Sequence, residues 1–175
     1  VGILIRNHTN VEIKNCETIH NTRGIVIDQS NFVTVKSSRF SNSVEEGIQA
    51  TDSNNLKIEE NAITQTQHAL WLTNVQDSLI LRNQLHTNDN GQILLLGSSR
   101  NNITENNVTN VASNYPIVLN PTSTNNVVYK NAFARYPSAP ADSGTNNRWS
   151  VGGQGNYWSS HPCIDNTWDG ICENR

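Results

Sequence analysis

The sequence contains no methionine, few aromatic residues and no long apolar segment. Aromatic residues make up 6% of its 175 residues and charged residues 15%, and the net charge at pH 7 is -3. No apolar run approaches the roughly 18 residues of a membrane-spanning helix, so we expect no membrane insertion. Without an excess of basic residues the chain also lacks the charge pattern of a nucleic-acid-binding protein, and no nucleic-acid partner is expected.

Cysteine is also scarce, with three residues, an odd number. In an oxidising compartment two of them would pair and one would remain. The chain begins with Val1 rather than with Met, which leads us to expect a processed or excised piece of a longer protein. We therefore expect an exported protein that is secreted, periplasmic or held at the cell surface.

Asparagine is abundant instead, with 28 residues, and it is accompanied by 16 serines and 15 threonines. These residue types are unfavourable inside helices, because their side chains compete for backbone hydrogen bonds, and they are common in turns. The composition therefore argues against a mainly helical fold.

A repeat of 22 to 25 residues runs through most of the chain. Similar segments begin at Gly2, Gly24, Gly47, Ala69 and Gly91, and a sixth begins near Pro116. Within each segment apolar and polar residues alternate in two short runs, a pattern typical of strands. Alignment of the segments gives three columns: Ile3, Ile25, Ile48, Leu70, Ile93 and Ile117; Ile13, Val35, Ile58, Ile80, Ile103 and Val128; and Thr18, Phe40, Ile63, Leu85, Val108 and Phe133.

Columns of like residues are what a stack of short-stranded coils requires, because each coil rests on the previous one at roughly 4.8 Å. The sequence therefore predicts an all-β fold, a right-handed single-stranded parallel β-helix of about seven coils with a C-terminal cap.

A polar column lies between the second and third apolar columns. It consists of Cys16, Ser38, Asn61, Asn83, Asn106, Asn131 and Asn156. An inward-turned asparagine can bond to its counterparts in the neighbouring coils and to the turn backbone, which satisfies polar groups that an apolar residue would leave unpaired. We expect Asn61, Asn83, Asn106, Asn131 and Asn156 to form an asparagine ladder.

These repeats resemble those of right-handed parallel β-helix proteins of the pectate-lyase-like superfamily, and most nearly those of NosD-type repeat proteins. The asparagine-rich phrase at 101–108 is similar to the lines of such proteins, and 155–159 is similar to a phrase that closes many of them. The resemblance implies the β-helix fold. It says little about activity, because the superfamily is functionally mixed.

The repeat ends near residue 133. Segment 134–144 is rich in turn formers and is expected to be a loop, after which 147–151 and 155–158 return to the coil register. We assign 1–133 to the coils and 134–175 to the last coil and a disulfide-closed cap of the same domain. Trp149, Tyr157, Trp158 and Trp168 cluster here; we favour a plug for the end of the core over a platform for sugars.

The tail carries a candidate calcium loop. Asp165, Thr167 and Asp169 stand at alternate positions before Gly170, a spacing that turns several oxygens onto one hard cation. The carbonyl of Ile171 and the carboxylate of Glu173 would complete the ligand shell. The phrase resembles the D-x-D-x-D-G loops of dockerins and thrombospondin type 3 repeats, although Thr167 departs from that pattern. The alternative is an acidic turn without metal.

Cys163 and Cys172 bracket this loop and are predicted to form a disulfide that fixes the tail. Cys16 is then left over. Its column places it inside the first coil as a small, inert filler.

A catalytic site is less clearly marked. Asp28 and Asp52 fall in adjacent columns on one outer face, and two nearby carboxylates can perform acid–base chemistry on a glycosidic bond. Solvated surface residues are the commoner explanation. The motifs of polygalacturonase-like hydrolases and of alginate epimerases are absent, which argues against an enzyme without excluding one.

Histidine offers no metal cluster in the sequence. His8, His20, His68, His86 and His161 share no column. NosD-type proteins are associated with copper, but without Met and without a Cys/His cluster we cannot assemble a soft copper site from these residues, and surface histidines are expected.

Three asparagines, Asn7, Asn102 and Asn107, stand in the acceptor pattern for N-glycosylation. Such matches arise easily in a chain rich in Asn and Thr, and they matter only in a cell that glycosylates exported proteins.

The sequence thus favours a structural and carbohydrate-recognising β-helix module whose rows of Asn, Thr, Ser and Gln bind a polysaccharide or cell-surface glycan. One alternative is the C-terminal part of a polysaccharide lyase, hydrolase or epimerase. Another is a subunit of a surface filament or layer that associates end to end through its N-terminal coil.

Overall fold

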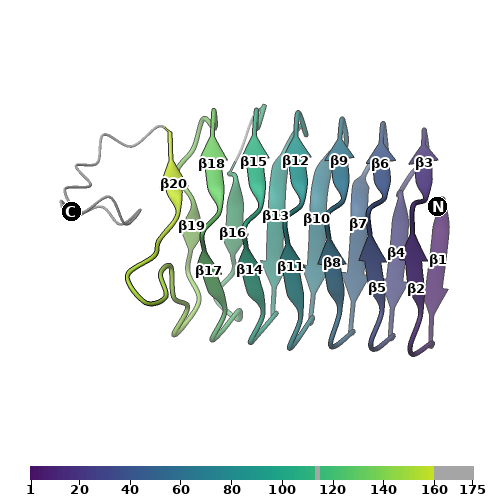
Figure 1. Ribbon diagram of the computed structural model, residues 1–175, viewed down its shortest axis with the longest axis horizontal. Coiled ribbons are helices and arrows are strands. Elements are labelled where there is room, and N and C mark those ends of the chain that lie inside the picture. The colour runs from purple at the N-terminus through teal and green to yellow at the C-terminus, as the bar shows by residue number, and fades with distance from the viewer. Residues whose placement is uncertain (113–114, 160–175) are drawn as a thin grey trace.

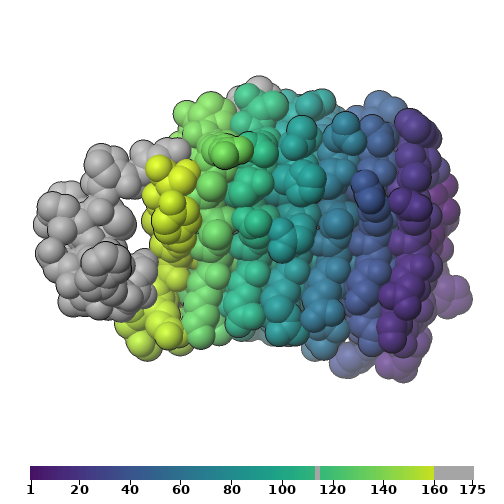
Figure 2. Space-filling view, turned by 45° about the horizontal axis from the view of Figure 1, so that its top comes forward, coloured from purple at the N-terminus to yellow at the C-terminus, as the bar shows by residue number. Residues whose placement is uncertain are grey.

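The computed structural model describes residues 1–112 and 115–159. In this part of the chain the backbone forms twenty short β-strands and no helix. The strands wind into a stack of coils along one long axis, from the N-terminus at the right of Figure 1 toward the C-terminal coils at the left. Successive coils form parallel bands in the space-filling view (Figure 2).

Three parallel sheets run along the stack, two with seven strands and one with six. Sheet 1 contains β1 (Ile3–Arg6), β4 (Ile25–Asp28), β7 (Glu46–Thr51), β10 (His68–Thr73), β13 (Gly91–Leu96), β16 (Ile117–Leu119) and β19 (Ala141–Asp142). Sheet 2 contains β2 (Glu12–Lys14), β5 (Thr34–Lys36), β8 (Lys57–Glu59), β11 (Leu79–Leu81), β14 (Asn102–Thr104) and β17 (Val127–Tyr129). Sheet 3 contains β3 (Glu17–Ile19), β6 (Arg39–Ser41), β9 (Ala62–Thr64), β12 (Gln84–His86), β15 (Asn107–Thr109), β18 (Ala132–Ala134) and β20 (Tyr157–Trp158).

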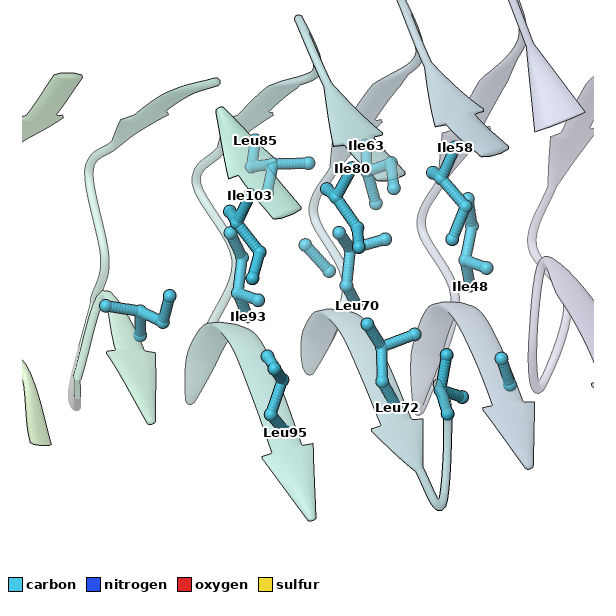
Figure 3. Packing of buried hydrophobic residues seen from close by; sticks show 14 of the residues in the cluster. Ile48, Ile58, Ile63, Leu70, Leu72, Ile80, Leu85, Ile93, Leu95 and Ile103 are labelled. Atoms are coloured by element: carbon cyan, nitrogen blue, oxygen red, sulfur yellow. The ribbon is translucent and has the colours of Figure 1, made fainter. Parts of the chain in front are cut away.

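The register of the sheets follows the sequence repeat. Ile48 pairs with Ile25 on one side and with Leu70 on the other, and Ile80 likewise pairs with Ile58 and Ile103. These side chains fill the interior in continuous columns (Figure 3). Each such residue is fully buried and contributes roughly 1.5–3 kcal/mol through the hydrophobic effect. The predicted all-β parallel β-helix is thereby confirmed.

Left-handed residues make the corners between the sheets. Asn10, Asn55 and Asn125 have φ values of 58°, 55° and 58° at equivalent points of their coils. Asparagine enters this region more readily than other residues with a side chain, because its short polar group bonds to nearby backbone. Phe32 occupies the same point of the second coil with a φ of 54°, although it is bulky and 55% exposed.

The last described coils close on aromatic side chains. The rings of Phe133 and Trp158 stack with centroids 4.5 Å apart, and Trp149 and Trp158 both pack against the core. Segment 134–144, expected to be a loop throughout, contributes strand β19 to sheet 1. The two-residue strand escaped prediction because so short a run has no recognisable alternation.

Among the described residues no helix has the length and apolarity needed to cross a membrane.

Candidate functional site

The asparagine ladder lies at the corner between sheets 2 and 3. Asn61, Asn83, Asn106, Asn131 and Asn156 are all buried there. The Nδ2 group of Asn83 donates to the Ile58 carbonyl at 2.8 Å and to Oδ1 of Asn106 at 3.0 Å. The backbone N–H of Asn83 donates to the same oxygen at 2.9 Å. Each side chain therefore satisfies polar groups in both neighbouring coils, which is a structural role.

A second polar ladder, which the sequence analysis missed, lies at the corner between sheets 1 and 2. It consists of Ser78, Asn101, Asn126 and Asn147. The backbone N–H of each of the first three donates to Oδ1 of the next residue at 2.9–3.0 Å. In the first three coils the same column holds the apolar residues Val11, Val33 and Leu56, so its polar half is not evident from the sequence. Together the two ladders and the left-handed corners account for much of the asparagine content.

The outer face of sheet 1 holds the most varied set of side chains. Leu4, Val26, Gln49, Trp71, Leu94 and Val118 form its central row in register. Arg6, Asp28, Thr51, Thr73 and Leu96 form a second row in register. A third short row consists of Glu46, His68 and Gly91. Three strands, β4, β7 and β10, thus bring aromatic, amide, hydroxyl and charged groups onto one surface.

Trp71 stands in the middle of this surface and is partly exposed. Its Nε1–H group donates to the hydroxyl of Thr73 at 3.1 Å. The His68 ring meets the indole edge to face, with centroids 4.9 Å apart. These contacts hold the indole in one orientation on the sheet.

His68 lies between this indole and the carboxylate of Glu46, its register partner on β7. Burial lowers the pKa of His68, and the negative charge of Glu46 opposes this only in part. Its Nδ1 atom is buried and has no hydrogen-bond partner among the described residues. The imidazole is therefore neutral at pH 7.

The charged groups of this surface are paired. Nε of Arg6 lies 2.8 Å from Oδ2 of Asp28. Arg23, just before β4, binds the carboxylates of Glu45 and Glu46, with 2.6 Å from its Nε to Oε2 of Glu46.

The two catalytic candidates have separate partners. Asp28 is held by Arg6, whereas Oδ1 of the exposed Asp52 accepts a hydrogen bond from Nδ2 of Asn74 at 2.9 Å. Asp28 lies beside Thr51 in register, so the two aspartates do not share a row. Each carboxylate is therefore engaged with its own neighbour rather than with the other carboxylate.

The three glycosylation candidates differ in their surroundings. Asn7 is exposed at a left-handed corner with a φ of 55°. Asn102 lies on β14 with its Oδ1 atom buried. Asn107 is exposed on β15 and donates to Oε1 of Gln84 at 2.9 Å. Of the three, Asn102 is therefore the least accessible to an enzyme.

The predictions for the tail concern residues outside the described part of the chain. They comprise the calcium ligands Asp165, Thr167, Asp169, Ile171 and Glu173 and the disulfide Cys163–Cys172. Cys16, the free cysteine of the described part, is partly exposed rather than enclosed as expected, since among the described residues the first coil has a neighbour on one side only. Its thiol donates to the carbonyl of Lys14 at 3.4 Å.

Fold and surface together define a parallel β-helix protein of the solenoid type. A family model for NosD, the "Periplasmic copper-binding protein (NosD)", matches residues 1–115 and 93–163. The chain therefore belongs to the NosD family, as its repeats suggested. The description of that family as periplasmic supports the expected exported location, periplasmic or extracellular.

Solved structures show the same fold. The periplasmic alginate epimerase AlgG superposes with a TM-score of 0.71 and 23% identity over 78% of this chain. A single-residue mutant of AlgG gives the same values. This chain spans 33% of the epimerase chain, so the likeness concerns the fold of the coils. A comparison with curated proteins finds no match.

Copper, which the family description names, does not fit the described residues. Within 1–112 and 115–159 no three His, Cys, Asp or Glu side chains gather in a way that could hold a metal ion. His8, His20 and His86 are exposed, and their coils hold them in different rows. His161 lies outside the described residues. We therefore assign no copper ligand in the coils.

Proposed function

We propose that this chain is a periplasmic structural module that recognises a carbohydrate on the outer face of sheet 1. The observation that carries this proposal is the position of Trp71, whose indole is fixed by Thr73 and His68 in the centre of the face. An aromatic ring of this kind offers an apolar surface to the C–H face of a sugar, while its polar edge is already satisfied.

The neighbours of Trp71 supply hydrogen bonding. Gln49 lies beside it in register, and Thr51 and Thr73 line the adjacent row. All three are partly exposed and carry neutral groups that donate and accept hydrogen bonds. Because rows repeat at roughly 4.8 Å along the stack, an extended polymer lying along the axis meets equivalent positions on successive coils. Such a flat, preformed surface suits a polysaccharide.

The test is retention on a glycan array that carries neutral and acidic polysaccharides. We expect binding without turnover, weakened about tenfold or more in Trp71→Ala because the stacking surface is lost. Phe32→Ala is the matched control, since it removes a 55%-exposed aromatic ring from the corner after β4 rather than from the face. Absence of binding to every glycan would exclude the proposal.

The same array separates binding from catalysis. If the chain is instead the C-terminal part of a polysaccharide lyase, hydrolase or epimerase, bound polymer will be converted to product. Conversion would then fall in Asp28→Asn or Asp52→Asn. Retention of intact polymer supports the recognition module.

Two further parts of the proposal concern the ends of the chain. We propose that the tail binds calcium through Asp165, Thr167 and Asp169, and that the bound ion stabilises the C-terminal cap. We also propose that the first coil allows end-to-end association of two copies, because β1, β2 and β3 are edge strands that each have one neighbour among the described residues. Sedimentation velocity over a range of concentrations tests the latter: a species of constant monomeric size would contradict it.

A further inference from the structure

We infer that the outer face of sheet 1 selects neutral glycans and rejects polyuronates. This inference rests on the proposed glycan recognition and adds the chemical class of the ligand. It is drawn from the distribution of charge on the face.

The arginines on this face are already neutralised. The strands of sheet 1 contain one arginine, Arg6, and no lysine. Arg6 is paired with Asp28 at 2.8 Å, and Arg23 at the edge of the face is shared between Glu45 and Glu46. A polyuronate carries one carboxylate on every sugar, and each needs a cation or several donors to replace its water. In this part of the structure both arginines are committed to carboxylates of the protein.

The one remaining basic group of the face carries no positive charge at neutral pH. Burial lowers the pKa of His68, so its imidazole is neutral beside Trp71. A carboxylate brought next to it would also approach Glu46, which is 8% exposed and negatively charged. Like charges in this position repel one another.

The lysines of the chain lie elsewhere. Lys14, Lys36 and Lys57 belong to sheet 2, and Lys130 directly follows β17 of the same sheet. In Figure 1 sheets 2 and 3 lie in front of sheet 1, so the strands that carry these lysines lie on a different side of the coil. With a net charge of -3 the whole chain also repels polyanions, an effect screened within about 10 Å at 0.1 M salt.

Two oligosaccharides that differ only at C6, which is a hydroxymethyl group in one and a carboxylate in the other, test the inference. We would titrate the whole chain with β-1,4-linked mannan and with β-1,4-linked mannuronate oligomers of equal length, by calorimetry at low and moderate salt. The expected result is mannan binding that depends on Trp71, with mannuronate at least tenfold weaker. The difference should shrink as salt screens the repulsion.

The outcomes distinguish the two claims. Equal or tighter binding of mannuronate through Trp71 would overturn the charge selection and leave glycan recognition standing. Binding of neither oligomer, nor of any other neutral glycan, would overturn the proposed function and this inference with it.

A substitution tests the cause. Asp28→Asn releases Arg6 without changing the shape of the side chain, so the preference for mannan over mannuronate should fall several-fold. Glu17→Gln is the matched control: it releases Arg39, 3.7 Å away on sheet 3, and should leave both affinities unchanged. An unchanged preference in Asp28→Asn would contradict the assigned cause. Melting curves confirm that both variants fold.

Discussion

Asn106 and Asn131 are bonded through a single oxygen atom. Oδ1 of Asn131 accepts the backbone N–H of Asn106 and also its side-chain Nδ2 group, both at 2.9 Å. The same Nδ2 group reaches back to the carbonyl of Ile80 at 3.0 Å. One asparagine thus joins three coils at a corner that is closed to water, where an unpaired polar group is costly.

This arrangement predicts a large loss of stability in Asn106→Ala. The change removes the acceptor of the Asn83 backbone N–H, one of the two acceptors of its Nδ2 group, and a donor to the Ile80 carbonyl, and a lost hydrogen bond at a buried group costs about 1–3 kcal/mol. We expect a loss of about 3 kcal/mol or more in the free energy of unfolding, measured with urea. Asn107→Ala, at the exposed neighbouring position, should cost under about 0.5 kcal/mol. Equal losses would contradict a role for the ladder.

A substitution at Phe32 is expected to increase the free energy of unfolding. Its backbone is left-handed with a φ of 54°, where coils before and after carry Asn10 and Asn55. Phe32→Asn should therefore raise the free energy of unfolding by about 1 kcal/mol, because asparagine tolerates this conformation. The control Val44→Asn replaces another exposed apolar residue, one without left-handed backbone, and should change little. A destabilised Phe32→Asn variant would show that the ring makes contacts of its own.

The pH dependence of stability should report on His68. Burial lowers its pKa in the folded protein below the ordinary value of 6.5. The unfolded chain therefore binds a proton at His68 more readily than the folded protein does. The contribution of the neutral imidazole to the free energy of unfolding is complete above pH 6.5 and is lost as the pH falls toward the lowered pKa. The melting temperature should drop less between pH 7.5 and 5.5 in His68→Gln than in the parent.

His86→Gln, an exposed histidine on β12, is the control and should follow the parent curve. If His68→Gln has the same pH dependence as the parent, burial does not lower the pKa of His68, which would contradict the account.

Calcium removal tests the tail. If Asp165, Thr167 and Asp169 hold the ion, a chelator should lower the melting temperature, and added calcium should restore it by mass action. Asp169→Asn should abolish this response. A melting temperature that changes with neither chelator nor calcium would contradict calcium binding and favour an acidic turn without metal.

The sequence predicted the fold well because each core column repeats in every coil. Ile48, Leu70 and Ile93 pair in the register read from the 22-residue spacing. The second polar ladder could not be predicted, because its column mixes apolar residues such as Leu56 with polar ones such as Asn101. Only the hydrogen bonds between successive coils show that these residues occupy equivalent positions.

The candidate site was harder to predict for a local reason. At the start of β7 and β10 consecutive residues are buried, such as Ala69 and Leu70, so the alternation that assigns faces fails there. His68 consequently lies on the outer face beside Trp71, and the spacing of these two residues in the sequence does not predict this contact. Asp28 and Asp52, found by alignment of columns, lie on the coils as expected, but their partners are visible only in three dimensions.

The central claim, that the outer face of sheet 1 binds a glycan through Trp71, can be tested directly by nuclear magnetic resonance. The chain has four tryptophans, so a ¹⁵N-labelled sample gives four indole N–H signals, assigned through Trp→Phe variants. On addition of a neutral β-1,4-linked oligosaccharide we predict a saturable shift of the Trp71 signal, with those of Trp149 and Trp158 unchanged because both pack against the core. A binding glycan that shifts another indole and leaves Trp71 unmoved would contradict the account.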